Sequence, residues 1–480
     1  MSRIPNDYKR RDFMHPRLAL LFACVLGAGL GLDACGSAAG PVPRLGSAQT
    51  SAHHHTTSNP ITHIVLLVQE NRTFNDLFAT FPNVLATTTG LKRTGRGKNA
   101  KTVSIPLTES NLAVKQNLNH LYVSYKVAYR DGNMDAFNLI KNQTNGKNEG
   151  SQPYQYVNPA QVQEYATLAT DYGIADHMFQ TQGSGSFTAH QDLIRGGTEI
   201  NSTASLVDDP TSSAAWGCTS PSGTKTSLIT TSLKYEAGAG PFPCTNQFPT
   251  TSGGSYNTLA DLFGGTISWK YYAPKDKNYT VGALWNGFLV IDSIWGNPSE
   301  WSAHISSPSK NIFSDISGGT LPQMSWVIPD AVDSDHPGYA SDKGPSWVAS
   351  VVNAIGASQY WNSTAVIVVW DDWGGFYDPV EPPPLDTQGG PGFRVPMLVI
   401  SPYVPANEIS HTVYGFGSII KFIEDNWSLG SLGTTDQTST SIIDMFNFGQ
   451  KPRKYKLIPA KYSRSFFMQQ KPSGLPVDTE

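Results

Sequence analysis

The chain has 480 residues, a formal net charge of −4 and 39% hydrophobic residues. This length allows one large α/β domain with insertions or two domains, and the slight negative charge gives no argument for a nucleic-acid partner. Only 15% of the residues are charged, whereas glycine (44) and proline (33) are plentiful, which favours a loop-rich exported protein over a coiled or disordered one.

Residues 1–35 are predicted to be a signal peptide. Basic residues Lys9–Arg11 precede an apolar segment, Leu18–Leu32, which has the length of a signal-peptide core and is short for a membrane span. The run Arg10-Arg11-Asp12-Phe13-Met14 resembles the twin-arginine export signal, although an ordinary basic leader could also begin this way. We therefore expect the mature protein to be periplasmic, on the cell surface or secreted.

The end of this leader resembles a bacterial lipoprotein signal. In Leu32-Asp33-Ala34-Cys35, Cys35 would be the acylated residue, although Asp33 stands where a small residue is usual. Acylation would attach the protein to a membrane through a lipid anchor. Residues 36–60, rich in Gly, Ala, Ser, Thr and Pro, are predicted to be a flexible linker. A folded domain is predicted over 61–460 and a tail over 461–480.

Two apolar runs each lead directly into oxygen-bearing side chains. Ile61–Val68 is followed by Gln69, Glu70 and Asn71, and Ala365–Trp370 is followed by Asp371 and Asp372. The second run contains no polar residue, and runs of this kind are typical of strands buried on both faces of a parallel sheet. Since such strands end at one edge of the sheet, we expect Glu70 and Asn71 to lie together with Asp371 and Asp372.

Glu70, Asn71, Asp371 and Asp372 would form an oxygen-rich set suited to a divalent metal ion, whose identity the set leaves open. The alternative for Asp371 and Asp372 is an acidic turn after the strand, with one aspartate capping a helix. Further strands are predicted at 266–272, 324–329 and 395–401, and helices at 345–358 and 418–427.

Two cysteines remain beyond the leader, Cys218 and Cys244. An even pair in an exported protein favours a disulfide over two unpaired thiols. The surrounding segment, near 205–255, is rich in Ser, Thr, Gly and Pro and is predicted to be an insertion. Trp285–Trp295, which is largely apolar, could line a pocket, although core packing is the more frequent use of such a segment.

Several short motifs resemble the bacterial phosphoesterase family that includes phospholipases C and certain acid phosphatases, within the alkaline-phosphatase-like superfamily. These motifs are ENRTFNDLF (70–78), Asn119-His120 with GNMDAF (132–137), SGSFTAHQDL (184–193), DSDHP (333–337), DDWGGFYD (371–378) and GFRVPMLVISPY (392–403). The resemblance implies an α/β fold, a three-layer α/β/α sandwich with a mainly parallel central sheet.

The resemblance also implies roles for individual residues. Glu70 and Asn71 match metal ligands, Ser186 matches the nucleophile, His336 matches an active-site histidine, and His120 matches one near the phosphoryl group. A nearby cation and a helix N-terminus would lower the pKa of the serine hydroxyl for attack on phosphorus. Without the resemblance, Ser186 would be interpreted as a helix N-cap and the two histidines as loop residues.

The implied function is metal-dependent hydrolysis of a phosphate ester, either a phospholipid or a soluble monoester, through a phosphoserine. The sequence departs from the family at Asn75, Gly185 and Thr188, and at Pro379, which replaces a frequent histidine. Proline supplies neither a proton nor a metal ligand. The alternative function is therefore a non-catalytic cell-surface binding protein on a degenerate phosphoesterase fold.

Overall fold

The computed structural model describes residues 59–210, 217–241, 244, 248–249, 255–256, 258–275 and 281–477. The predicted signal peptide, the twin-arginine motif, Cys35 and nearly all of the linker lie outside the described residues. In the described part of the chain, no helix combines the length and the apolar character that crossing a membrane requires.

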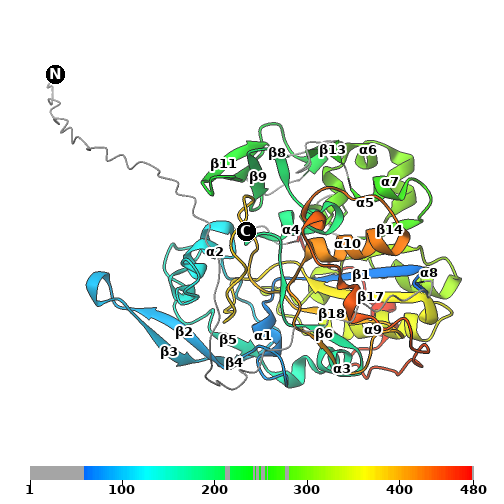
Figure 1. Ribbon diagram of the computed structural model, residues 1–480, viewed down its shortest axis with the longest axis horizontal. Coiled ribbons are helices and arrows are strands. Elements are labelled where there is room, and N and C mark those ends of the chain that lie inside the picture. Colours follow the sequence, from blue (N-terminus) through cyan, green and yellow to red (C-terminus); the bar gives the residue numbers. More distant parts are fainter. Residues whose placement is uncertain are drawn as a thin grey trace, which may run out of the picture. The chain divides into compact units, whose positions relative to one another are not determined.

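An eight-stranded sheet occupies the centre of the fold, in the order β15-β14-β16-β1-β17-β18-β6-β19 (Figure 1). All neighbours in it pair in parallel except β18, which runs antiparallel to both β17 and β6. The predicted α/β fold with a mainly parallel sheet is thus confirmed. The strands are β1 (His63–Gln69), β6 (Gly173–Ala175), β14 (Trp269–Tyr272), β15 (Ile305–Ser306), β16 (Met324–Val327), β17 (Thr364–Trp370), β18 (Met397–Ile400) and β19 (Glu408–Ser410).

Strands β1 and β17 are adjacent and parallel at the middle of this sheet. Their register pairs His63 with Thr364 and Gln69 with Trp370, so both strands end level with one another. Every residue of β17 is buried. The polar residues that follow the two apolar runs consequently emerge side by side at the same edge, as the sequence predicts.

Helices cover both faces of the sheet (Figure 1). One face carries α4 (Ser186–Arg195), α5 (Leu259–Phe263) and α10 (Phe416–Trp427), and the other carries α3 (Gln163–Asp171), α8 (Asn311–Gly318), α9 (Gly344–Gly356) and α11 (Arg464–Gln469). The indole of Trp326 donates a hydrogen bond of 3.0 Å to Leu193 O of α4. On the opposite face, Tyr165 of α3 packs edge-on against Trp370, with ring centroids 4.9 Å apart.

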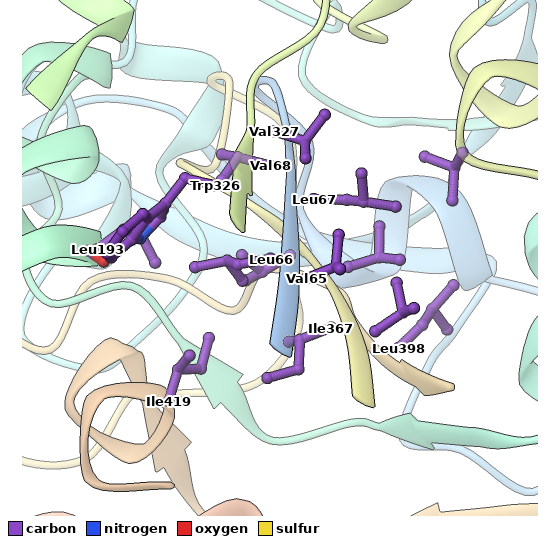
Figure 2. Packing of buried hydrophobic residues seen from close by; sticks show 14 of the residues in the cluster. Val65, Leu66, Leu67, Val68, Leu193, Trp326, Val327, Ile367, Leu398 and Ile419 are labelled. Atoms are coloured by element: carbon purple, nitrogen blue, oxygen red, sulfur yellow. The ribbon is translucent and has the colours of Figure 1, made fainter. Parts of the chain in front are cut away.

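The core follows from the alternation of side chains along β1. Leu66 and Val68 point toward the face that holds Trp326 and Leu193, whereas Val65 and Leu67 point the other way (Figure 2). Successive side chains of a strand face opposite sides, and here both sides are apolar and buried. Burial on two faces explains why Ile64–Val68 contains no polar residue.

Smaller elements surround this core. A separate four-stranded antiparallel sheet has the order β11-β10-β9-β8, and four two-stranded sheets pair β2 with β3, β4 with β5, β7 with β20 and β12 with β13. Their bounds, with those of the remaining helices, are α1 (Phe74–Phe78), β2 (Thr89–Thr94), β3 (Lys101–Pro106), β4 (Thr108–Ser110), α2 (Tyr122–Tyr129), β5 (Gln155–Val157), β7 (Met178–Phe179), β8 (Glu199–Asn201), β9 (Ala204–Val207), β10 (Lys225–Thr230), β11 (Tyr235–Pro241), β12 (Phe248–Pro249), β13 (Ser255–Tyr256), α6 (Asp292–Trp295), α7 (Pro298–His304) and β20 (Tyr414–Gly415).

A disulfide joins Cys218 and Cys244, 26 residues apart. We expect the double variant Cys218→Ser, Cys244→Ser to lose about 3 kcal/mol of unfolding free energy, since the cross-link restricts the unfolded chain. Urea denaturation under oxidising conditions would measure the loss. A reductant should lower the stability of the wild type to that of the variant and leave the variant unchanged. Equal stability of the two proteins without reductant would contradict this expectation.

Candidate active site

The residues after β1 and β17 are held together by backbone hydrogen bonds. The amide of Asp371 donates to Gln69 O (2.9 Å), and the amide of Asn71 donates to Asp371 Oδ1 (2.9 Å). Asn71 adopts a left-handed backbone conformation (φ 54°), as does Gly374 (φ 57°). A Cβ at Gly374 would lie 2.1 Å from Asn71 O, so this close approach requires glycine.

Ser186 is the first residue of α4, and Gly185 is the N-cap. The serine hydroxyl therefore does not cap the helix, which removes the simplest structural explanation for it. It faces the oxygen-rich set instead. Its Oγ lies near three acceptors: Asp372 Oδ2 (3.3 Å), Asn71 Oδ1 (3.4 Å) and Glu70 Oε2 (3.5 Å).

Three carboxylates share this buried site, since Glu70, Asp371 and Asp372 are each 0% exposed. Burial, followed by the charges of Asp371 and Asp372, raises the pKa of Glu70 well above its ordinary value. Burial and the charge of Asp371 likewise raise the pKa of Asp372. Asp371 Oδ2 accepts no hydrogen bond from the described residues. A divalent cation would neutralise this arrangement, so the residues fit a metal ion.

His190 belongs to the same cluster, although sequence reasoning did not select it as a site residue. Its Nε2 lies 2.9 Å from Glu70 Oε1 and 3.9 Å from Asp371 Oδ2. Burial lowers the pKa of His190 to about 4 despite the opposing effect of Asp371, so the imidazole is neutral near pH 7. A neutral imidazole can ligate a metal. The available signal was the spacing, because residues four apart on a helix share a face, and His190 follows Ser186 by four.

His120 contacts Asn71 with one ring nitrogen and a carbonyl with the other. Nδ1 lies 2.7 Å from Leu118 O, and Nε2 lies 2.7 Å from Asn71 Nδ2. Because a carbonyl only accepts, these partners assign the proton to Nδ1 and make Nε2 an acceptor. This bond turns Asn71 Oδ1 toward the serine. His120 Nε2 is also 3.6 Å from Asp372 Oδ2.

His336 lies on a loop that is bonded to the same strand end. The amide of Glu70 donates to Ser334 O (2.8 Å). The ring centroid of His336 is 5.8 Å from that of Trp285, which in turn is 6.3 Å from that of His190. Trp285 is fully buried, so the first residue of the apolar segment predicted at 285–295 packs in the core and lies near both histidines.

A carboxylate from the region predicted as an insertion reaches the start of α4. Asp209 Oδ1 accepts a hydrogen bond of 3.1 Å from the amide of Phe187. A negative charge is favourable at a helix N-terminus, and Asp209 also contributes to the raised pKa of Asp372. No sequence motif pointed to Asp209, because only the return of the chain after β9 brings it here.

The sequence profile of the Phosphoesterase family matches residues 61–430. The chain belongs to this family. The match contains the whole cluster described above. Eight of its side chains are at least 96% buried: Glu70, Asn71, His120, Ser186, His190, His336, Asp371 and Asp372.

Curated relatives of this family member are similar over part of their length. Phospholipase C B of Mycobacterium tuberculosis is 29% identical over 226 residues, which cover 40% of this chain and 43% of that protein. Non-hemolytic phospholipase C of Pseudomonas aeruginosa is 24% identical over 434 residues, covering 78% and 55% respectively. The chain thus spans about half the length of these relatives.

Among solved structures, a protein of the alkaline phosphatase superfamily from Vibrio parahaemolyticus aligns with a TM-score of 0.36 and 12% identity, covering 81% of this chain and 72% of that one. The lipoteichoic acid synthase LtaP from Listeria monocytogenes aligns with a TM-score of 0.31 and 10% identity, covering 81% and 75%.

Proposed function

We propose that this chain is a metal-dependent phosphoesterase that transfers the phosphoryl group of its substrate to Ser186. The observation that carries the proposal is the position of the Ser186 hydroxyl, at the start of α4 and within 3.5 Å of oxygens from three residues of the cluster. Membership of the Phosphoesterase family supports the hydrolysis of phosphoric esters.

Glu70, Asn71, Asp371 and Asp372 would hold a divalent ion, with His190 as a further donor beside Glu70 and Asp371. When bound, such an ion would stabilise negative charge on the phosphoryl oxygens and on the serine oxygen. Buried ligands of this kind cannot rearrange freely, since Asn71 is fixed to Asp371 through its amide and to His120 through its side chain. His120 is therefore proposed to position Asn71.

The proposed reaction has two steps. Ser186 Oγ forms a bond to phosphorus while the ester oxygen departs with the electron pair of its bond. The serine proton passes to a neighbouring carboxylate, of which Asp372 Oδ2 is nearest at 3.3 Å. His336 gives a proton to the departing oxygen as a general acid. Water then attacks the phosphoserine and gives its proton to His336, while Ser186 Oγ departs and takes back the proton held by Asp372. This step releases the phosphate or phosphorylated head group.

The named relatives favour a phospholipid as the substrate. Both are phospholipases C, so we propose cleavage on the glycerol side of the phosphate, with release of the phosphorylated head group. Purified protein loaded with a divalent ion should release phosphocholine from phosphatidylcholine faster than phosphate from p-nitrophenyl phosphate. Release of phosphate from p-nitrophenyl phosphate, without release of phosphocholine from phosphatidylcholine, would instead favour an acid phosphatase.

Failure to turn over either compound would favour the non-catalytic binding protein. The sequence feature behind that alternative, Pro379, is partly exposed. It follows Asp378, whose carboxylate pairs with Arg394 (2.9 Å) and accepts the amide of Asn75 (3.2 Å). The residues around Pro379 thus form a structural ion pair, whereas the oxygen-rich cluster lies around Ser186.

We also propose that the protein is exported through the twin-arginine route. The Arg10-Arg11 motif supports this proposal, as does the disulfide, because disulfides persist outside the reducing cytoplasm. The double variant Arg10→Lys, Arg11→Lys should accumulate inside the cell with its signal peptide uncleaved. Fractionation and immunoblotting would measure this. Unchanged export of the variant would assign the protein to the general secretory route.

A lipid anchor on Cys35 is the proposed means of membrane attachment. Cys35→Ser removes the thiol that would be acylated, so the variant should move from the membrane fraction to the soluble fraction. The amount of protein that sediments with the membranes of lysed cells, before and after a high-salt wash, would measure this change. An identical partition of both proteins would rule out the anchor.

A further inference from the structure

A second group of potential metal ligands lies at the same edge of the central sheet as the oxygen-rich cluster, outside the machinery described above. Strands β6 and β19 are parallel, and their register pairs Ala175 with Ser410. Asp176 directly follows β6 and His411 directly follows β19, so these two residues are neighbours. His177 follows Asp176 directly. The pairing joins residues 235 positions apart in the sequence.

Both imidazoles turn the same ring nitrogen toward one carboxylate. His177 Nδ1 lies 2.8 Å from Asp176 Oδ1, and His411 Nδ1 lies 2.9 Å from both oxygens of Asp176. One donor atom from each residue lies within 4.8 Å of the other two. Three ligand atoms thus converge on one point from two separate connections of the sheet.

The carboxylate of Asp176 is held in place by neighbouring groups. Asp176 Oδ2 accepts the amide of Leu85 (2.8 Å), and the carbonyl of Asp176 accepts a hydrogen bond from Arg394 (2.7 Å). Such outer contacts are typical of residues that orient a metal ligand.

Solvent reaches the group from one side. The side chain of Asp176 is 0% exposed, that of His177 is 18% exposed and that of His411 is 58% exposed. His177 also lines a surface hollow of about 360 Å³ together with Phe179, Val413 and the segment 380–384. A small ion therefore has an entry path, and a water molecule has room to complete its coordination.

We propose that Asp176, His177 and His411 bind a transition-metal dication. The chemistry of these three donors favours Zn²⁺. Two imidazole nitrogens and one carboxylate oxygen, with an open position, are a typical zinc donor set, whereas the cluster around Ser186 is dominated by hard oxygen donors. Asp176 directly follows β6, which is separated from β17 by one strand, β18. At the usual strand spacing, the ends of β6 and β17 are roughly 10 Å apart, so the two sites are separate.

The bound ion would tie the connection after β6 to the connection after β19. The former leads into β7 and the latter into β20, and these two strands pair with each other immediately before α10 begins. Zn²⁺ at this place would stabilise the β7–β20 pair and the start of α10 without taking part in catalysis.

Equilibrium dialysis of the full-length chain against Zn²⁺, followed by elemental analysis, tests the proposal. The measurement is made in the background Asp371→Asn, His53→Ala, His54→Ala, His55→Ala, which removes a ligand of the oxygen-rich cluster and the three consecutive histidines that could bind zinc themselves. We expect this protein to retain one equivalent of Zn²⁺ and to lose it when His411→Gln is added. The X-ray absorption spectrum of the retained zinc should show the scattering of two imidazole ligands.

Two results would overturn the proposal: no retained zinc in the background protein, or equal zinc content with and without His411→Gln. The first would mean that the three residues form only hydrogen bonds. His177→Gln provides a second variant if His411→Gln does not fold, as judged by circular dichroism. A rise in melting temperature on adding Zn²⁺, present in the background protein and absent from either histidine variant, should accompany binding.

Discussion

Ser186→Ala is expected to lower turnover by roughly 10³-fold or more, because the variant lacks the oxygen that would attack phosphorus. The unfolding free energy should change by less than about 1 kcal/mol, since Gly185 rather than Ser186 caps α4 and the serine contacts are long. Steady-state kinetics and urea denaturation of the same preparations would separate the two effects. Acid quenching during turnover should trap a phosphorylated peptide containing Ser186 in the wild type.

Thr188→Val is the matched control for this variant. Thr188 lies in the same helical turn and is equally buried, but its hydroxyl bonds to Ser184 Oγ (2.9 Å) and Gly185 O (3.1 Å). Its loss should cost about 1 kcal/mol of stability while turnover stays within a few-fold of the wild type. Equal turnover in Ser186→Ala and Thr188→Val would refute the nucleophile assignment.

Asp371→Asn should abolish metal binding at the cluster around Ser186, at concentrations that saturate this cluster in the wild type. The substitution keeps the side-chain shape and the oxygen that accepts the Asn71 amide, but removes one negative charge from the site. Since losing an outer contact to a metal ligand already weakens binding 10- to 100-fold, losing a charged ligand should weaken it by at least about 100-fold. Chelation should inactivate the wild type, and adding the metal back should restore the wild type alone.

Glu70→Gln should behave in the same way, because Glu70 shares the site with Asp371. Glu300→Gln, on the exposed helix α7, is the control and should keep its metal content and activity. In metal-free protein, Asp371→Asn should unfold at a temperature no lower than that of the wild type, since it relieves repulsion among buried carboxylates. Full metal content and activity in both cluster variants would exclude this ion site.

The predicted strands and helices that match the structure share strong local signals. Ile64–Val68 of β1 and Ala365–Trp370 of β17 contain no polar residue, and the helical spacing over 345–358 corresponds to α9, Gly344–Gly356. The strand predicted at 395–401 exists as β18, but its direction was not predictable. An apolar run has the same sequence pattern in a parallel and in an antiparallel strand, and β18 runs antiparallel to both of its neighbours.

His190 and Asp209 show why part of the cluster escaped prediction. His190 carried a usable signal, its four-residue spacing from Ser186 on one helix face. Asp209 carried none, because its place beside Phe187 depends on how the chain returns after β9. The tautomer of His120 also depended on tertiary contacts, since Leu118 O and the Asn71 amide together assign its proton.

By itself the sequence determined which strands are buried and which polar residues follow them, because burial and hydrogen bonding of short segments are local properties. The sequence alone therefore predicts that Glu70 and Asp371 lie at one edge of the sheet. Only the tertiary structure decided which distant side chains meet there. The distance from Ser186 to Asp372 and the meeting of Asp176 with His411 depend on strand order and register, which are set by the packing of the whole core and by no single segment.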